Sequence, residues 1–239
     1  SNGNLSGENV VVGRQIQSLE RAGMEVGVFS KASDAKAKLL EQLHASWNVA
    51  SGFGASPSKF LEEFQPDVIH LHNTFPNISR MWINEANSPI VATVHNFRSM
   101  CANGTFFRDG KPCFDCPTLG AGSALVHKCY KNSFVKTVPL FLDMSKGIAK
   151  SYLSSSKVTP IFLHEQVREI YETYGFDGRE SVVIPNFFTP HSKSNTGPAA
   201  RDKWLFVGRL SAEKGVVELI KNWPRNQVLE IYGDGPLRA

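Results

Sequence analysis

The sequence predicts an α/β protein built around a parallel sheet. Two segments, 66–73 (PDVIHLHN) and 88–96 (SPIVATVHN), each contain a short apolar run that ends in the pair His-Asn. Polar side chains at the ends of buried strands, with helical segments between the strands, are typical of parallel α/β sheets. The order strand-then-helix begins again at 204–208 (WLFVG). We therefore expect one parallel-sheet domain followed by the beginning of a second.

The other elements follow from apolar periodicity and from breaker residues. Residues 7–30 predict a helix, a turn at Gly23 and a short buried strand at 25–29 (EVGVF). Periodicity fails over 97–132, so this segment is predicted to be an insertion. The remaining predictions are helix over 34–64 with a break at 51–57, helix over 134–153, strand at 158–163, helix over 165–176, strand at 181–187, helix over 213–223 and strand at 228–233.

Composition divides the chain into two domains. Residues 189–202 are rich in Pro, Gly, Ser and Asn and have no apolar face, as is typical of a linker. The first domain is then 1–188, with the cysteine-rich insertion at 97–132, and the second begins at 203–239. Two strands and one crossover helix cannot cover both faces of a sheet, and no strand precedes the first helix. We therefore expect a chain truncated at both ends.

The overall composition excludes several classes of protein. A formal net charge of +4 is too small to indicate a nucleic-acid-binding protein. No apolar run approaches the roughly 18 residues of a membrane-spanning helix. The four cysteines all lie between 101 and 129, and a large apolar content elsewhere makes disulfides unnecessary for a core. This distribution favours a reducing compartment, so we expect a cytoplasmic protein.

Two cations follow a predicted buried strand and precede a predicted helix. Ligands of open parallel sheets bind beyond the carboxyl ends of the strands, where a helix N-terminus favours anions. Gly208 allows a tight backbone turn, and Ser211 is a candidate helix cap. Because cations are mildly unfavourable at a helix start, a solvated surface role explains Arg209 and Lys214 less well than binding of a diphosphate does.

A second turn of the same type follows the next strand. Gly233, Asp234 and Gly235 precede Pro236, which stands where the first residue of a helix is expected. By itself, a tight turn explains these glycines. Two such turns on neighbouring strands favour a nucleotide pocket.

Histidines and asparagines gather at the ends of the two strands of the first domain. His70, His72 and Asn73 end one strand, and His95 and Asn96 end the other. A lone histidine there is more often structural than catalytic, but the set predicts a cleft rich in neutral hydrogen-bonding groups. Histidines two residues apart share one face of a strand, which also allows metal binding. No carboxylate partner is evident, so a metal is the less favoured interpretation.

The cysteine spacing allows a structural metal site. Cys101, Cys113, Cys116 and Cys129 include one C-x-x-C pair flanked by two further thiols, and His127 is a spare candidate ligand. A tetrahedral zinc would stabilise a long insertion without a core of its own. Two disulfides, or four reduced thiols in a loop, are the alternatives.

Several motifs in order along the chain resemble glycosyltransferase family 4. FVGRLSAEKGV (206–216) and YGDGPLR (232–238) resemble the signature segments that open the C-terminal domain of that family. PDVIHLHN, TVHNFRSMC and SGENVVVGRQIQSLERAGMEV are similar to its N-terminal domain. The insertion GTFFRDGKPCFDC (104–116) resembles a subgroup found among bacterial polysaccharide-assembly enzymes.

The resemblance implies the GT-B fold, in which two Rossmann-like domains face each other across a cleft. Such enzymes transfer a hexose from a nucleotide diphosphate sugar to an acceptor hydroxyl with retention of anomeric configuration, usually without a metal. The resemblance implies that catalysis needs no cofactor, and we expect no nucleic acid partner. The acceptor would be a saccharide or a lipid-linked saccharide, and a lipid-linked acceptor would bring the enzyme to the inner face of a membrane.

The resemblance also implies roles by position. Arg209 and Lys214 would hold the diphosphate, and His95 would hydrogen-bond the transferring sugar. Gly7 would let the first loop approach the phosphates, and Gly233–Gly235 would border the nucleotide. The remaining candidate substrate-binding residues are Asn73, Asn96 and Gly208.

Two departures from the family pattern bear on these roles. The first loop carries Ser6 before Gly7 where the family usually has paired glycines. The acidic motif that binds the donor sugar would lie beyond Ala239, so we expect this fragment alone to be inactive.

Three alternatives stay open at this point. The protein could bind a nucleotide sugar without transferring it, or it could be a zinc-stapled interaction module. Within enzymes, a GT-B epimerase or phosphorylase would share the fold and the phosphate-binding cations.

Overall fold

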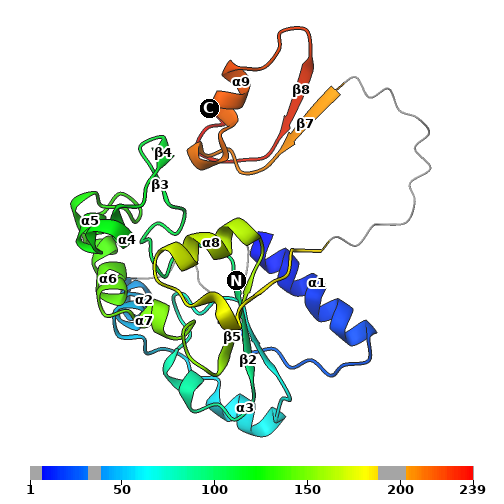
Figure 1. Ribbon diagram of the computed structural model, residues 1–239, viewed down its shortest axis with the longest axis vertical. Helices are drawn as coiled ribbons and strands as arrows, with labels where there is room; N and C mark the ends of the chain where they lie inside the picture. The colour runs from blue at the N-terminus through cyan, green and yellow to red at the C-terminus, as the bar shows by residue number, and fades with distance from the viewer. Residues whose placement is uncertain (1–6, 32–38, 188–202, 239) are drawn as a thin grey trace. The chain divides into compact units, whose positions relative to one another are not determined.

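The structure is a computed structural model that describes residues 7–31, 39–187 and 203–238 (Figure 1). The predicted linker at 189–202 lies outside the described residues. Contacts divide the chain into two compact units. The first comprises 1–106 and 114–187, and the second comprises 107–113 and 188–239. Each unit is described by itself.

The first unit is built on a four-stranded parallel sheet, which confirms the predicted fold class. The strand order is β1-β2-β5-β6, and the long central pair β2–β5 aligns Ile90 with Val158 and Val94 with Phe162. Four of the five residues of β2 are buried, as are four of the five in β5. Continuous apolar strands of this kind are typical of a sheet covered on both faces. The strand bounds are β1 Ile69–Leu71, β2 Ile90–Val94, β5 Val158–Phe162 and β6 Val182–Val183.

Helices and short turns follow the strands, as the sequence predicts. Ser133 and His164 cap two of them, since each side chain accepts a hydrogen bond from a first-turn backbone N–H. The predicted helix over 134–153 is split at Gly147, whose φ of 66° is left-handed. The bounds are α1 Gly7–Arg21, α2 Leu39–Ser51, α3 Ser58–Phe64, η1 Met81–Asn84, α4 Asp115–Leu119, α5 Gly122–Val126, α6 Phe134–Ser145, α7 Ile148–Ser151, α8 Glu165–Thr173 and η2 Gly178–Glu180.

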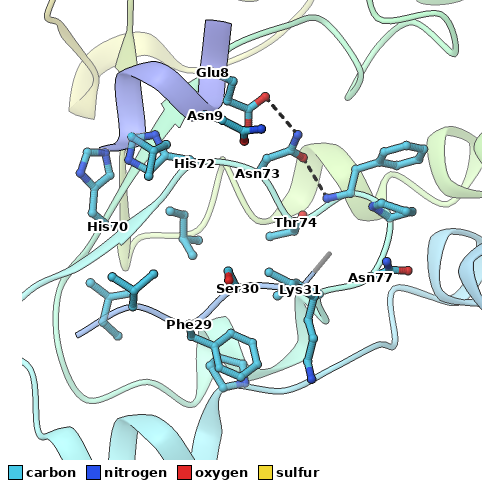
Figure 2. A pocket seen from close by; sticks show the side chains of 18 of the residues that line it. Glu8, Asn9, Phe29, Ser30, Lys31, His70, His72, Asn73, Thr74 and Asn77 are labelled. Carbon is cyan, nitrogen blue, oxygen red and sulfur yellow. Dashed lines mark hydrogen bonds between the residues drawn. The ribbon is translucent and has the colours of Figure 1, made fainter. Parts of the chain in front are cut away.

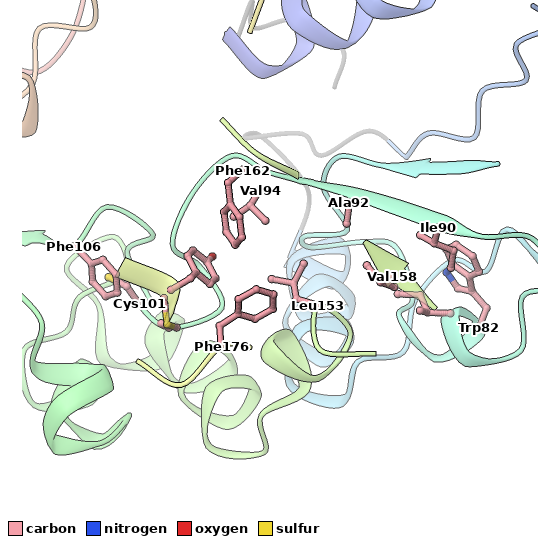
Figure 3. Close-up of a cluster of buried hydrophobic side chains, with 13 residues drawn as sticks. Trp82, Ile90, Ala92, Val94, Cys101, Phe106, Leu153, Val158, Phe162 and Phe176 are labelled. Carbon is pink, nitrogen blue, oxygen red and sulfur yellow. The ribbon is translucent and has the colours of Figure 1, made fainter. Parts of the chain in front are cut away.

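The main hydrophobic core lies where β2 and β5 meet α8 (Figure 3). Phe162 is fully buried, and its ring lies 5.1 Å from that of Tyr171 and 5.6 Å from that of Phe176, measured between centroids. Aromatic rings at such separations gain attraction beyond the burial of their area. This cluster therefore holds α8 against the sheet.

A buried ion pair joins the segment before η1 to α6. Arg80 donates to both carboxylate oxygens of Asp143, at 3.2 and 3.0 Å, and the two side chains are only 11% and 3% exposed. A bidentate pair of this kind fixes orientation, and removing one partner leaves an uncompensated charge.

The predicted strand at 25–29 is wrong: these residues form no strand in the structure. The sheet ends at β1, so no paired strand among the described residues lies beyond that edge. A strand needs a hydrogen-bonding neighbour, and apolar character alone does not supply one. Helix α1, which precedes this segment, likewise buries none of its residues.

The second unit contains a parallel pair of strands with one crossover. β7 (Lys203–Val207) pairs in register with β8 (Val228–Tyr232). The crossover contains η3 (Ala212–Lys214) and α9 (Val216–Lys221), which Gly215 separates with a left-handed φ of 66°. The helix predicted over 213–223 is therefore shorter than expected. The segment 107–113 forms the small antiparallel hairpin β3 (Phe107–Arg108) and β4 (Lys111–Pro112).

Replacing Phe162 with Ala is expected to lower the free energy of unfolding by about 3–5 kcal/mol, because it leaves a cavity between β5 and α8. Urea denaturation of the first unit measures this change. The matched control is Phe53→Ala, at a position that is 56% exposed, where we expect a change within about 0.5 kcal/mol. Equal effects at both positions would contradict the proposed core.

Candidate functional site

Three histidines meet at the carboxyl ends of β1 and β2. The rings of His70 and His72 lie 4.2 Å apart between centroids, which confirms that they share one face of the strand. His72 Nδ1 lies 3.0 Å from His95 Nε2, and His70 Nε2 lies 2.8 Å from Thr93 Oγ1. Sequence reasoning missed Thr93, although it lies two residues before His95 on β2. The structure thus brings together the three histidines that the sequence placed at neighbouring strand ends.

Burial keeps this histidine cluster neutral. Desolvation lowers the pKa of all three imidazoles, and for His72 the nearby His70 and His95 lower the pKa further, to about 3. In the hydrogen bond between His72 and His95, one neutral ring donates and the other accepts. The cluster can therefore offer neutral donors and acceptors to a ligand near pH 7.

The two predicted asparagines have structural roles in this structure. Asn73 Oδ1 accepts from Phe75 N at 2.9 Å, and Asn96 Oδ1 accepts from Arg98 N at 3.0 Å. These bonds stabilise the turns that follow β1 and β2. In both asparagines, which the sequence predicts to bind substrate, the side-chain oxygen thus accepts a hydrogen bond from the backbone.

The first turn of α1 contributes a carboxylate to the same region. Glu8 Oε2 accepts a hydrogen bond of 3.3 Å from Asn73 Nδ2 (Figure 2). Burial raises the pKa of Glu8, against the opposing effects of Asn73 and Arg98. Sequence reasoning singled out Gly7 and passed over its neighbour. A Cβ at Gly7 would meet nothing within 4 Å, so the space beside this helix start is open.

Arg98 is a second residue that the sequence did not single out. Its guanidinium carbon lies 4.2 Å from the centroid of the Phe75 ring and 5.6 Å from that of Tyr130. Nη1 also donates to Ala102 O at 3.2 Å. These contacts join the loop after β2 to the loop after β1 and to the insertion.

A large cavity opens beside the histidine cluster. Its volume is about 1940 Å³, above the roughly 300–1,000 Å³ of a typical ligand site. Apolar residues of α1, α3 and β1 line much of it, whereas His70, His72, Asn73 and Glu8 form a polar end (Figure 2). Hydrogen-bonding groups of this polar end are suited to contact saccharide hydroxyls. A second, small cavity of about 50 Å³ shares His72 and Asn73 and extends to His95 and Arg98.

In the second unit, Arg209 and Lys214 are both exposed. Although burial alone would raise it, the pKa of the Glu213 carboxyl is lowered by hydrogen bonds from Ser211 and its own backbone, and by the charges of Arg209 and Lys214. Both cations therefore lie near one carboxylate. The predicted helix cap is wrong, since Ser211 Oγ donates to Glu213 rather than accepting from the backbone.

The glycines after β8 are explained by a close approach of two loops. A Cβ on Gly233 would overlap Gly208 O, and a Cβ on Gly235 would overlap Leu210 O. Asp234 O accepts from Leu210 N at 2.9 Å, and its Oδ1 accepts from Gly235 N at 2.8 Å. Packing alone therefore requires the two glycines, and nucleotide binding is not needed to explain them.

The structure does not gather the four cysteines into the predicted zinc site. Cys101 lies in the main core with Phe106, whereas Cys116 and Cys129 pack against a separate cluster around Ala124 and Leu140. None of the four forms a disulfide. Within the described ranges, no three His, Cys, Asp or Glu side chains could share a metal ion.

Aromatic and apolar side chains of the insertion pack into the two apolar clusters of the first unit. The ring centroids of Phe97 and Phe106 are 4.7 Å apart, and those of Phe106 and Phe114 are 5.0 Å apart. This aromatic stack continues to Tyr174 of the first unit, 5.8 Å from Phe114. Side-chain packing therefore joins the insertion to the rest of the first unit.

A covered parallel sheet with polar groups at the carboxyl ends of its strands defines a Rossmann-like α/β domain. A family model described as Glycosyltransferase Family 4 matches residues 5–191, and the chain belongs to that family. The match covers the histidine cluster and ends before Arg209. No curated protein and no solved structure matches the chain.

Lowering the pH below 6.5, the ordinary histidine value, is expected to destabilise the first unit. The unfolded chain binds protons that the native imidazoles resist, so stability is complete above pH 6.5 and is lost as the pH falls toward about 3, the folded pKa of His72. The variant His72→Gln removes the most strongly shifted imidazole. Urea midpoints measured at pH 7 and at about pH 4.5 should therefore differ less in this variant than in the wild type.

The control for this experiment is His44→Gln, because His44 is an exposed residue of α2 outside the cluster. We expect it to lose as much stability in acid as the wild type. Glu8 is present in the wild type and in both variants, so its effect on the pH dependence of stability cancels when the variants are compared with the wild type. An undiminished acid loss in His72→Gln would contradict a neutral, buried cluster.

Proposed function

We propose that the protein transfers a hexose from a nucleotide diphosphate sugar to an acceptor hydroxyl, with retention of configuration. Membership of glycosyltransferase family 4 supports glycosyl transfer in general. The observation that carries the finer proposal is the neutral His95 at the carboxyl end of β2, which is hydrogen-bonded to His72 and borders the small cavity. A neutral imidazole can hydrogen-bond sugar hydroxyls without adding a charge that would oppose a developing oxocarbenium ion.

His72 gives His95 a defined orientation in this proposal. Since Nε2 of His95 is hydrogen-bonded to His72, its other ring nitrogen, Nδ1, is the atom that would contact the sugar. Glu8, which lies beside Asn73, is suited to accept hydrogen bonds from acceptor hydroxyls.

Arg209 and Lys214 would act on the leaving group. As the bond between the sugar and the diphosphate breaks, negative charge grows on the phosphate oxygens, and fixed cations stabilise it. Both residues are exposed, Arg209 just after β7 and Lys214 at the end of η3. Two cations can serve where other transferases use a divalent metal, so we propose that catalysis needs neither a metal nor another cofactor.

We propose a role in polysaccharide or glycoconjugate synthesis, with a saccharide or a lipid-linked saccharide as the acceptor. The support is the resemblance of the 104–116 insertion to enzymes of polysaccharide assembly. No nucleic acid is needed as a partner in this proposal. We place the reaction in the cytoplasm, at the inner face of the membrane when the acceptor is lipid-linked.

Arg209→Ala and Lys214→Ala are each expected to reduce kcat/KM for the donor at least about tenfold, equivalent to about 1.4 kcal/mol of lost transition-state stabilisation. The measurement is donor turnover by the full-length gene product, with UDP- and GDP-sugars compared. Lys221→Ala is the matched control, since Lys221 is an exposed lysine at the end of α9.

The outcomes separate the proposed function from its main alternative. Turnover that collapses in both variants and survives in the control supports a transferase. Nucleotide-sugar binding without turnover would indicate the non-catalytic alternative. Full activity in both variants would show that the two cations are surface charges without a role in transfer.

A further inference from the structure

Arg98 is a half-buried cation that forms no ion pair with any described carboxylate. Its guanidinium lies against the rings of Phe75 and Tyr130 and makes one hydrogen bond to a described residue, from Nη1 to Ala102 O. A guanidinium has five N–H donors, so most of them have no protein acceptor. Burial lowers the pKa of Arg98 because it disfavours the charged form. An anionic partner would offset this cost.

The unused donors of Arg98 are accessible. Among the described residues, the buried side-chain atoms that lack a hydrogen-bond partner are Gln15 Oε1 and Arg168 Nε, so no unbonded nitrogen of Arg98 is fully buried. Arg98 also borders the small cavity, together with His72 and His95. A guanidinium whose flat face lies on an aromatic ring offers its N–H groups in its own plane, where two of them can bind two oxygens of one anion.

The lining of the small cavity has one positive charge in excess. Of the described residues that border it, the charged ones are Arg80, Arg98 and Asp143. Arg80 and Asp143 neutralise each other through their two hydrogen bonds. The imidazoles of His72 and His95 are neutral near pH 7 because burial lowers the pKa of both. The excess charge is therefore that of Arg98.

The size of this cavity suits a single charged group. Its volume is about 50 Å³, and a single water needs roughly 10–15 Å³ by the same measure. The cavity can therefore hold a few non-hydrogen atoms but not a sugar ring. We propose that it binds one anionic group of the acceptor sugar, a carboxylate or a phosphate, through Arg98.

This inference rests on the proposed function, in which the two cations of the second unit already match the diphosphate of the donor. The small cavity shares His72 and Asn73 with the polar end of the large cavity, where Glu8 would contact acceptor hydroxyls. Glu8 borders the large cavity and not the small one, and its carboxylate would repel an anion. The acceptor would therefore bind with its hydroxyls near Glu8 and its anionic group near Arg98.

The test measures binding of three sugar probes to the 239-residue chain by saturation-transfer NMR titration. The probes are methyl glucoside, methyl glucuronide and methyl glucoside 6-phosphate, which share one ring and differ in the group on carbon 6. We expect at least one anionic probe to bind at least about tenfold more tightly than the neutral glucoside, since hydrogen bonds between charged groups are the strong ones. The probe that binds more tightly identifies the anion as a carboxylate or a phosphate.

Arg98→Met should abolish this preference and leave the affinity for methyl glucoside unchanged, because methionine keeps an apolar stem beside Phe75 but has no charge. Arg98→Lys keeps the charge without the paired donors, so we expect an intermediate preference. The matched control is Lys136→Gln, since Lys136 is an exposed cation that lines the large cavity. It should keep the full preference. Urea midpoints of all variants separate lost binding from lost folding.

A measurement on the wild type locates the anion even if the variants are unstable. The preferred probe should shift the imidazole nitrogen-15 resonances of His95, which borders the small cavity, and leave those of His44 on α2 unchanged. Since no donor and no turnover are needed, a failure of this inference is distinguishable from a failure of glycosyl transfer.

Four results would overturn the proposal. The first is a wild-type chain that binds no anionic probe more tightly than methyl glucoside. The second is a preference that is lost equally in Arg98→Met and Lys136→Gln, and the third is a preferred probe that leaves His95 unshifted. The fourth is weaker binding of UDP by a folded Arg98→Met variant that keeps the preference for the anionic sugar, which would assign Arg98 to the donor.

Discussion

The pairing of β2 with β5 is the constraint on which the rest of the first unit depends. Five aligned residue pairs, from Ile90–Val158 to Val94–Phe162, run through the centre of the sheet. Because β2 is buried, its carboxyl end is fixed, and His95 is held where the strand stops. The short strand β1 adds three residues in register on β2, and just beyond it the Nδ1 atom of His72 lies 3.0 Å from Nε2 of His95.

Burial of the three histidines lowers the stability of the first unit in acid. Three imidazoles kept neutral in a partly desolvated cluster give up stability in acid, and a fold without a use for them would gain by replacing them with apolar side chains. Strained or electrostatically unfavourable groups of this kind concentrate at functional sites. Arg98 supports this arrangement from outside, since its contacts with Phe75, Tyr130 and Ala102 hold together the loops that follow the two strands.

The sequence predicts the parts of this structure that are written in local patterns. Two strands that both end in His-Asn sufficed to predict the parallel sheet and the meeting of their histidines. The strand at 25–29 failed because strand formation depends on a partner, which is not visible in an apolar run. Glu8, Thr93 and Arg98 escaped notice because single polar residues carry no periodic signal. The zinc hypothesis rested on the spacing of the cysteines in the sequence. The aromatic rings that pack in the insertion are far apart in the sequence and meet only in the fold, so no local pattern indicates them.

In the second unit, a close backbone contact and the two cations of the proposed function share one loop. Close approach of the loops after β7 and β8 requires Gly233 and Gly235 whatever the ligand. That packing fixes the backbone from which Arg209 projects, and Lys214 follows at the end of η3. Glu213 lies near both and is held by Ser211, so two cations share one carboxylate and one positive charge is uncompensated. The diphosphate of the proposed donor, which carries more than one negative charge, would interact with this surplus positive charge more strongly than a neutral sugar would. In the proposed function, selectivity for a charged leaving group would therefore follow from the combined charge of this loop rather than from either cation alone.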